Sequence, residues 1–134
     1  MLNFKMKSNF FRLLSNCYDT NLEMSNYNKS VSKTKVILIT GCDSGFGYSL
    51  ACHVPEKHPT FLLIACCLSM ESEGAKNLIS KGVTVFNLDV TDVDSIEKLR
   101  QDVEVLLEEK NGEVWTIVNN AATLVFADAI LQTR

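Results

Sequence analysis

The sequence predicts an α/β fold with a doubly wound parallel sheet. Two observations predict it. Short runs of aliphatic and β-branched residues alternate with helical patterns along residues 35–134, and such alternation is typical of parallel strands joined by crossover helices. The first of these runs also leads directly into a glycine-rich turn. The order of elements corresponds to the N-terminal half to two-thirds of such a sheet, preceded by an extension and linker over residues 1–34.

The first strand is expected over residues 36–40, because a continuous apolar run suits a strand that is buried on both faces. A helix is expected over residues 45–54, with Phe46, Leu50 and Val54 on one apolar stripe. Pro55 and Pro59 are expected to end this helix.

The second strand is expected over residues 61–67. Ser69 is the expected N-cap of a helix over residues 70–80, and Gly82 follows at the position where helices prefer glycine. Residues 83–88 form the expected third strand.

The longest helix is expected after the loop at residues 89–92, where Thr91 and Asp94 have a spacing like that of a capping box. Its apolar and polar positions separate at helical spacing: the core positions are Val93, Ile96, Leu99, Val103 and Leu106, and the mostly water-facing positions are Glu97, Arg100, Asp102 and Glu108. A turn at Asn111 and Gly112 precedes the fourth strand, residues 114–118. Residues 124–134 resemble the start of another helix.

Composition is that of an ordinary globular protein. The chain has 134 residues, is 46% hydrophobic and 22% charged, and carries a formal net charge of −3. No basic stripe is present, so a nucleic-acid partner is not expected. The five cysteines are odd in number and form no C-x-x-C motif, and we expect Cys52, Cys66 and Cys67 to act as small core side chains. We therefore predict no metal site and a reducing compartment.

The N-terminal extension has a composition typical of a targeting segment. Residues 1–18 contain three basic residues, no acidic residue, and several apolar residues separated by Ser and Asn. This is typical of a mitochondrial transit peptide. An unstructured extension, an incorrect start codon and an interfacial segment that contacts a membrane are the alternatives. No run of 18 apolar residues occurs, so no membrane-spanning helix is expected.

The glycine turn that follows the first strand has the chemistry of a phosphate-binding loop. Gly41 lets the chain leave the strand in a tight turn, and Ser44 can cap the next helix. Gly45 exposes backbone to which phosphates can come close, and Gly47 lets the helix pack against the strands. Because the turn follows a strand and opens a helix, we predict a Rossmann-like dinucleotide site here.

Polar residues that follow two other strands extend this predicted site. Asp89 follows the third strand and could accept a hydrogen bond from an adenine amino group, although a capping or solvated loop residue is an equal alternative. Asn119 and Asn120 follow the fourth strand, where their amides could bond the backbone of neighbouring strands and shape a cofactor cleft. An Asn-Asn pair alone is more often part of a turn.

Together these segments resemble the short-chain dehydrogenase/reductase family over residues 35–134. The resemblance is carried by residues 40–47, 89–92 and 119–122, and it is greatest to the branch of retinol, 17β-hydroxysteroid and 3-hydroxybutyrate dehydrogenases. Residues 64–67 and 72–76 further resemble an insect member associated with ecdysteroid hormone synthesis. The resemblance implies an NAD(P)-dependent oxidoreductase acting on a lipophilic alcohol or ketone of the sterol or retinoid class.

The resemblance also implies the residues of a cofactor site. Asp89 would contact adenine, and Asn119 would stabilise the central strand beside the nicotinamide ribose. The full set expected to bind the cofactor is Gly41, Asp43, Ser44, Gly45, Phe46, Gly47, Cys67, Asp89, Val90, Asn119 and Ala121.

Two departures from the family pattern concern the reaction itself. Ala122 stands where the family usually has glycine, and we expect a mild effect on the cofactor cleft. The family's catalytic Ser, Tyr and Lys have no counterpart here, because none of Tyr18, Tyr27 and Tyr48 has a lysine four residues on. We expect these positions to lie beyond Arg134, so that this chain alone is inactive.

The choice between NAD and NADP is only partly readable. An acid that binds the ribose would be expected about 20 residues after the glycines. Cys67 and Leu68 stand there, neither an acid for NAD nor an arginine for the 2′-phosphate of NADP. Asp43 would repel a phosphate nearby, which slightly favours NAD(H).

Three hypotheses follow. The chain is part of a longer oxidoreductase with a lipophilic substrate, or a non-catalytic dinucleotide-binding protein, or an unstable product of a broken gene model whose fourth strand is an exposed edge. In the first case we expect an intracellular homo-oligomer, in mitochondria or at the endoplasmic reticulum surface, with peripheral membrane contact as an option.

Overall fold

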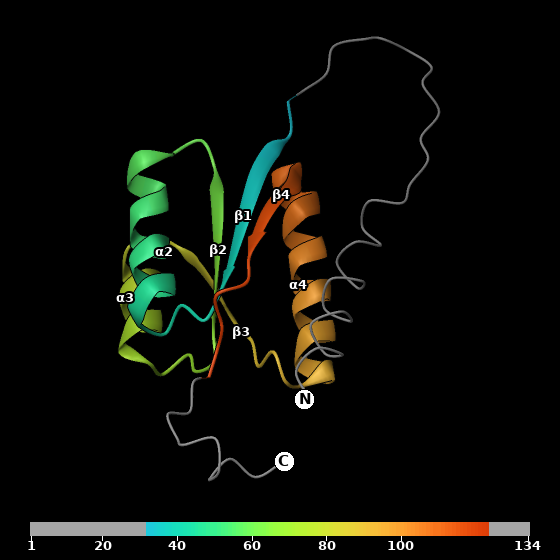
Figure 1. Cartoon of the computed structure of the whole chain (residues 1–134). Helices are drawn as coiled ribbons and strands as arrows, with labels where there is room; N and C mark the ends of the chain where they lie inside the picture. Colours follow the sequence, from blue (N-terminus) through green and yellow to red (C-terminus); the bar gives the residue numbers. More distant parts are fainter. Residues whose placement is uncertain (1–31, 124–134) are drawn as a thin grey trace, which may run out of the picture.

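The computed structural model describes residues 32–123, which form one parallel sheet flanked by helices (Figure 1). The predicted helix over residues 124–134 and the predicted targeting segment lie outside the described residues. Strands and helices alternate along the chain: β1 (Thr34–Thr40), α2 (Gly45–Lys57), β2 (Leu62–Cys67), α3 (Glu73–Ser80), β3 (Thr84–Asn87), α4 (Val93–Lys110) and β4 (Gly112–Val118).

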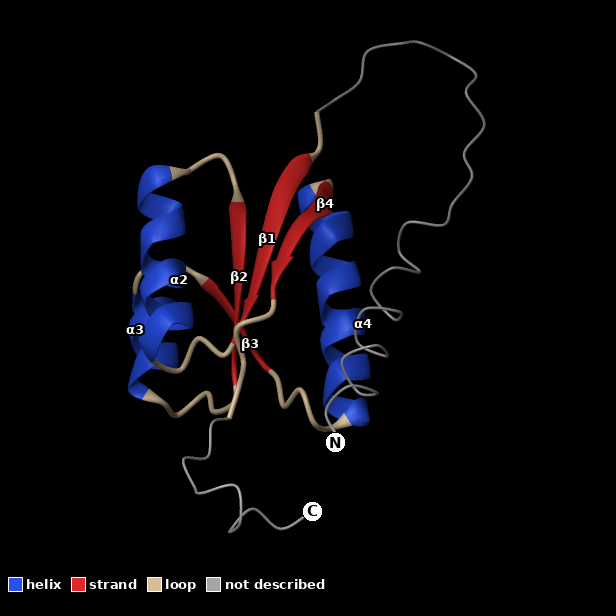
Figure 2. Ribbon diagram, viewed as in Figure 1, coloured by secondary structure: helices blue, strands red, loops and turns tan. Residues whose placement is uncertain are grey.

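The strand order β3-β2-β1-β4 brings the carboxyl ends of all four strands to the same edge of the sheet. All three pairings are parallel, with Thr40 opposite Cys66 and Ile39 opposite both Ala65 and Val118. Figure 2 shows α2 and α3 on one face of the sheet and α4 on the other. The predicted doubly wound parallel sheet is therefore confirmed over the described residues.

Alternating side chains of the central strands divide the interior into two cores. Val36, Leu38, Ile64 and Cys66 pack with α4, whose buried residues are Ile96, Leu99 and Val103. The neighbouring strand residues point to the opposite face and pack with α2 and α3; this second core contains Ile39, Cys42, Ala51, Val54, Leu63, Ala65, Cys67, Ala75, Leu78 and Val83. Both strands are thus buried on both faces, which explains their unbroken apolar runs.

Helix α2 differs from its prediction in its end and in its buried face. It runs to Lys57, past Pro55, and His58 N–H still donates to the Val54 carbonyl at 2.8 Å. A proline removes its own N–H but keeps a helical φ, so one residue in the last turn does not end the helix. Of the predicted apolar stripe only Val54 is buried, since Phe46 is 90% exposed and Leu50 is 39% exposed.

The N-caps of the next two helices also differ from the prediction. Helix α3 is capped by Ser72, whose hydroxyl accepts from Ala75 N–H, whereas the Ser69 hydroxyl accepts from Glu71 N–H in the preceding loop. Helix α4 is capped by Asp92, whose carboxylate accepts from Asp94 N–H. Thr91, the predicted cap, bonds to Asp89 instead.

A glycine follows α3 and an asparagine follows α4, as expected. Gly82, just after α3, has a φ of 79°, and Asn111, just after α4, has a φ of 46°. Left-handed residues at these positions let the chain turn out of a helix. No helix within residues 32–123 is long and apolar enough to cross a membrane.

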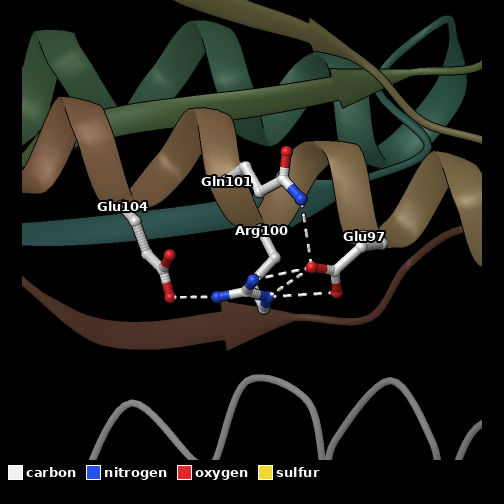
Figure 3. A network of polar contacts seen from close by, with 4 residues as sticks. All are labelled: Glu97, Arg100, Gln101 and Glu104. Carbon is white, nitrogen blue, oxygen red and sulfur yellow. Dashed lines mark hydrogen bonds and ion pairs between the residues drawn. The ribbon is translucent and has the colours of Figure 1, made fainter.

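Arg100 on α4 holds two acidic neighbours of the same helix (Figure 3). Its guanidinium donates to Glu97 at 2.6–3.1 Å and to Glu104 one turn further on. The pairing holds the pKa of Glu97 below its ordinary value, with a smaller contribution from the Gln101 amide. The Arg100 side chain is only 26% exposed, less than expected for a water-facing position. Such pairs between residues three and four positions apart stabilise a helix, here α4.

Candidate functional site: the turn after the first strand

The turn between β1 and α2 relies on glycine at two positions. Gly41 has a φ of 71° and Gly45 a φ of 62°, which is the left-handed region that side chains with a Cβ rarely adopt. The strand therefore ends at Thr40, and the chain reverses within a few residues into the first turn of α2. This confirms the predicted strand, glycine turn and helix.

Close packing around this turn excludes side chains at Gly41 and Gly47. A Cβ at Gly41 would lie 2.7 Å from the Ala121 Cα. A Cβ at Gly47 would lie 2.3 Å from the Gly41 carbonyl oxygen and 2.5 Å from the Asn120 amide nitrogen. Gly47 thus lets α2 approach the strands, as predicted, and the segment after β4 lies directly against the turn.

Thr40 and Asn120 tie the turn to the end of β4. The Thr40 hydroxyl oxygen accepts from the backbone N–H of Asn120 at 3.1 Å and of Ala121 at 3.0 Å. The Asn120 amide donates to the carbonyl oxygens of Thr40 and Gly41, both at 3.0 Å. These four hydrogen bonds join Thr40 and the glycine turn to the segment that follows β4.

The sequence offers the amides of both Asn119 and Asn120 for bonds to neighbouring strands, and the family resemblance implies Asn119 for the central strand. In the structure Asn120 makes these bonds, and Asn119 is exposed. Thr40, whose hydroxyl joins the network, is not among the predicted cofactor-binding residues. Consecutive side chains on extended backbone point in opposite directions, so only one of the two amides can face the turn. A contact between Asn119 and a nicotinamide ribose stays a prediction.

The N-terminus of α2 is open to solvent on its outer side. Ser44 occupies the N-cap position with extended backbone, although its hydroxyl makes no capping bond. No atom lies within 4 Å of the position that a Cβ would take at Gly45, and the Phe46 side chain is exposed. The first N–H groups of a helix have no partner within the helix and attract anions. The space beside Gly45 is thus open to an anion at the helix terminus.

Asp43 reaches from the same turn to the end of β2. Its two carboxylate oxygens accept from Leu68 N–H at 2.8 Å and from Ser69 N–H at 3.0 Å. Cys67, just before this loop, is fully buried, and burial together with the nearby charge of Asp43 raises its pKa to about 11. The Cys67 thiol therefore faces the core, and its carbonyl oxygen accepts from Leu88 N–H at 2.8 Å. A contact between Cys67 and the cofactor stays a prediction.

Asp89 lies at the same edge of the sheet, after β3. One of its carboxylate oxygens accepts from the Thr91 hydroxyl at 2.7 Å and from Thr91 N–H at 2.8 Å, and both bonds hold the pKa of Asp89 below its ordinary value. Its own N–H donates to the Ser95 hydroxyl. Val90 packs partly buried against the core beside α4. The loop is thus fixed with a charged carboxylate, and contact with adenine stays a prediction.

The strand order places all these residues along one edge, as predicted for a ligand site in a doubly wound sheet. Gly41, Gly47 and Ala121 are in direct contact around the turn. Asp43 joins this group to the end of β2, and Asp89 lies beyond it at the end of β3. In residues 32–123 no group of three His, Cys, Asp or Glu side chains could hold a metal ion.

Comparison with known proteins identifies the family. The sequence profile described as short chain dehydrogenase matches residues 35–132. The chain belongs to the short-chain dehydrogenase family. The match begins within β1 and continues past β4, so it includes the complete glycine turn.

Several curated short-chain dehydrogenases are similar over the same region. The chain is 37% identical over 100 residues to mitochondrial D-beta-hydroxybutyrate dehydrogenase of Bos taurus, covering 71% of this chain and 28% of the relative. It is 36% identical over 95 residues to estradiol 17-beta-dehydrogenase 2 of Rattus norvegicus, covering 69% of this chain and 24% of the relative. It is 38% identical over 93 residues to retinol dehydrogenase 7 of Mus musculus, covering 69% of this chain and 28% of the relative. The chain therefore spans about a quarter of the length of these relatives.

A solved structure confirms the fold. The NADPH-bound carbonyl reductase from chicken fatty liver superposes with a TM-score of 0.67 at 20% sequence identity, covering 75% of this chain and 39% of that chain. At this identity the likeness concerns the arrangement of strands and helices. It is consistent with the described part being a partial short-chain dehydrogenase domain.

Proposed function

We propose that the chain is the cofactor-binding portion of an NAD(P)-dependent short-chain oxidoreductase. The observation that carries the proposal is the fixed glycine turn, which Thr40 and Asn120 hold so that the N-terminus of α2 faces open space at Gly45. A rigid, positively polarised helix terminus is suited to a pyrophosphate.

Different residues along this edge would bind different parts of the cofactor. Backbone N–H groups at Gly45, Phe46 and Gly47 would bind the pyrophosphate. Asp89 and Val90 would lie beside adenine, and Asn119 and Ala121 beside the nicotinamide ribose. When bound, a nicotinamide cofactor supplies hydride exchange at its C4 atom. The described residues hold and orient it.

The proposed substrate of the full-length protein is a lipophilic alcohol or ketone of the sterol or retinoid class, including a step in ecdysteroid synthesis. Two relatives matched over this region are named for estradiol and for retinol, which supports the class. A third is named for beta-hydroxybutyrate and for mitochondria. We propose a mitochondrial or endoplasmic reticulum location, membrane contact at the periphery, and a homo-oligomeric full-length form.

A second function is favoured by one feature of the sequence. None of its three tyrosines is followed by lysine four residues on, the pair that the family resemblance makes the proton-transfer centre. The 134-residue chain by itself would then bind dinucleotide without turnover. Incubation with NAD⁺ and a steroid or retinoid alcohol tests this, because any formation of NADH would contradict it.

The proposed cofactor site is tested by adding a charge at the helix terminus without disturbing the core. Phe46 is 90% exposed, so Phe46→Glu and Phe46→Gln should both fold. A glutamate in the first turn favours the helix but repels a pyrophosphate, whereas glutamine has nearly the same shape and no charge. Titration calorimetry with NADH and NADPH should show binding by the wild type and the glutamine variant, and binding at least about tenfold weaker for the glutamate variant.

Two outcomes would contradict the proposal. One is a folded wild-type chain, as judged by circular dichroism, that binds neither cofactor. The other is equal affinity of the Phe46→Glu and Phe46→Gln variants, which would place the dinucleotide away from the N-terminus of α2.

A further inference from the structure

The carboxylate of Asp43 is built into the loop that follows β2. Its Oδ2 accepts from Leu68 N–H at 2.8 Å and its Oδ1 accepts from Ser69 N–H at 3.0 Å. Asp43 comes from the glycine turn, 25 positions earlier in the sequence than Leu68. An acid from one strand's loop thus sits at the carboxyl end of the neighbouring strand.

Two further contacts fix this carboxylate and the loop that it binds. The start of α3 packs against the Asp43 backbone so closely that a Cβ at Gly74 would lie 2.1 Å from the Asp43 carbonyl oxygen. On the other side, the Asn87 amide donates to the Leu68 carbonyl at 2.7 Å. The Asp43 backbone is therefore packed against α3, and the loop that its carboxylate binds is also bonded from the end of β3.

The end of β2 is where a dinucleotide-binding sheet reads the adenosine ribose, usually through an acid of that strand. Here the strand ends in Cys67 and Leu68, which have no carboxylate, and Asp43 supplies one from the glycine turn. Each Asp43 oxygen accepts one backbone N–H, and a carboxylate oxygen can accept a second bond. Both oxygens can therefore still accept from ribose hydroxyl groups.

Building on the proposed function, we propose that Asp43 is the residue that selects the cofactor. It accepts from the ribose 2′-hydroxyl of NAD(H) and repels the 2′-phosphate of NADP(H). Asp43 would therefore take the role of the ribose-binding acid that the end of β2 lacks, in addition to lying among the cofactor-binding residues.

Two cations of helices α3 and α4 are paired with acids other than Asp43. Lys76, on α3, is paired with Glu71 at 2.8 Å. Arg100 is the one arginine within residues 32–123, and it is bound to Glu97 and Glu104 on α4. A 2′-phosphate at the end of β2 would thus meet a fixed carboxylate without an available arginine among the described residues.

The test is the ratio of the NADPH and NADH dissociation constants for matched variants. Asp43→Asn removes the charge and keeps an oxygen that can accept one backbone N–H. Glu109→Gln removes a charge at the far end of α4 and controls for net charge. We expect the wild type and Glu109→Gln to bind NADH at least about tenfold more tightly than NADPH, and Asp43→Asn to reduce that ratio at least about fivefold.

A second variant keeps the test independent of the fold around Asp43. Leu68 is 62% exposed, so Leu68→Arg should fold and should raise NADPH affinity, whereas Leu68→Met should not. A wild type that prefers NADPH, or an unchanged ratio in Asp43→Asn and Leu68→Arg while Phe46→Glu still weakens NADH, would overturn this inference and leave the proposed function standing. A folded chain that binds neither cofactor would overturn both.

Discussion

The Asn120 amide donates to the carbonyl oxygen of Thr40 at 3.0 Å and so joins the ends of β4 and β1, whereas the neighbouring Asn119 is exposed. The two partners are 80 positions apart in the sequence. The same amide also bonds the Gly41 carbonyl, so one side chain from the segment after β4 holds both the end of β1 and the glycine turn. Stability and cofactor binding should therefore be coupled at this residue.

The first prediction concerns Asn120→Asp, which keeps the shape of the side chain and replaces the NH₂ group that donates both hydrogen bonds with one carboxylate oxygen. That oxygen would face two carbonyl oxygens in partly buried contacts. We expect a loss of about 1–3 kcal/mol in the free energy of unfolding, measured by urea denaturation. Asn119→Asp is the matched control, since Asn119 is exposed, and it should change stability by less than about 0.5 kcal/mol. Equal losses in both variants would contradict the assignment.

The second prediction concerns Gly47→Ala on α2. Alanine favours a helix over glycine by roughly 1 kcal/mol, so propensity alone predicts stabilisation. The added Cβ would however lie 2.3 Å from the Gly41 carbonyl oxygen, which is backbone and cannot rotate away. We expect a net loss of about 1–3 kcal/mol and weaker dinucleotide binding.

Ser49→Ala is the control for Gly47→Ala, since Ser49 is an exposed residue of the same helix. It should be neutral or slightly stabilising in the same thermal unfolding assay. A stabilised Gly47→Ala variant would show that α2 does not pack as closely on the turn as the structure indicates.

Features that depend on local sequence were predictable. β1 and β2 contain continuous apolar runs, and the alternation of strand and helix patterns predicts a parallel sheet. The glycine turn was also predictable from local sequence. Gly41 and Gly45 have positive φ values, which residues with a Cβ rarely adopt. These features put most of the candidate site at one edge of the sheet.

Choices between neighbouring residues were not predictable, because long-range contacts decide them. Ser69 and Ser72 are both suitable caps, and the turn after β2 determines that Ser72 starts α3. Asn119 and Asn120 have the same chemistry, and only the pairing of Val118 with Ile39 fixes which amide faces the turn. The stripe on α2 was largely wrong because the helix packs through Gly47 and Ala51, whose small size a search for large apolar residues overlooks.

The third prediction concerns the pH dependence of the Asp89 loop. The Thr91 hydroxyl and then its N–H hold the pKa of Asp89 below its ordinary value of 3.8. Because the folded pKa is the lower one, the stabilisation is present above pH 3.8 and is lost as the pH falls through the folded pKa. Thr91→Val removes the hydroxyl bond, so the pKa of Asp89 should rise toward 3.8 in a carboxyl NMR titration.

Thr91→Ser retains the hydroxyl group and is the control for Thr91→Val; it should leave the pKa of Asp89 low. If the valine variant titrates like the wild type, the Thr91 hydroxyl does not bond Asp89 in solution. The loop would then have a different arrangement at the edge where adenine is proposed to bind.

The last prediction uses the cysteines to test the core beside the site. Cys42, Cys66 and Cys67 are fully buried, and burial is the main cause that raises the pKa of Cys42 to about 12 and of Cys67 to about 11. Cys52 is only partly buried and its sulfur lies 3.4 Å from the Lys81 ammonium. Since thiolates are the reactive form, Cys52 should be alkylated first in the folded protein.

The measurement is mass spectrometry after alkylation with iodoacetamide in a Cys17→Ser background, which removes the cysteine outside the described residues. We expect one adduct in the folded protein and four after denaturation, with Cys52→Ser eliminating the early adduct. Cys42 directly follows Gly41 of the glycine turn, so its protection also reports whether the turn is closed. Early labelling of Cys42 together with Cys52 would mean that the turn opens in solution, and that the fixed helix terminus on which the cofactor proposal rests is not maintained.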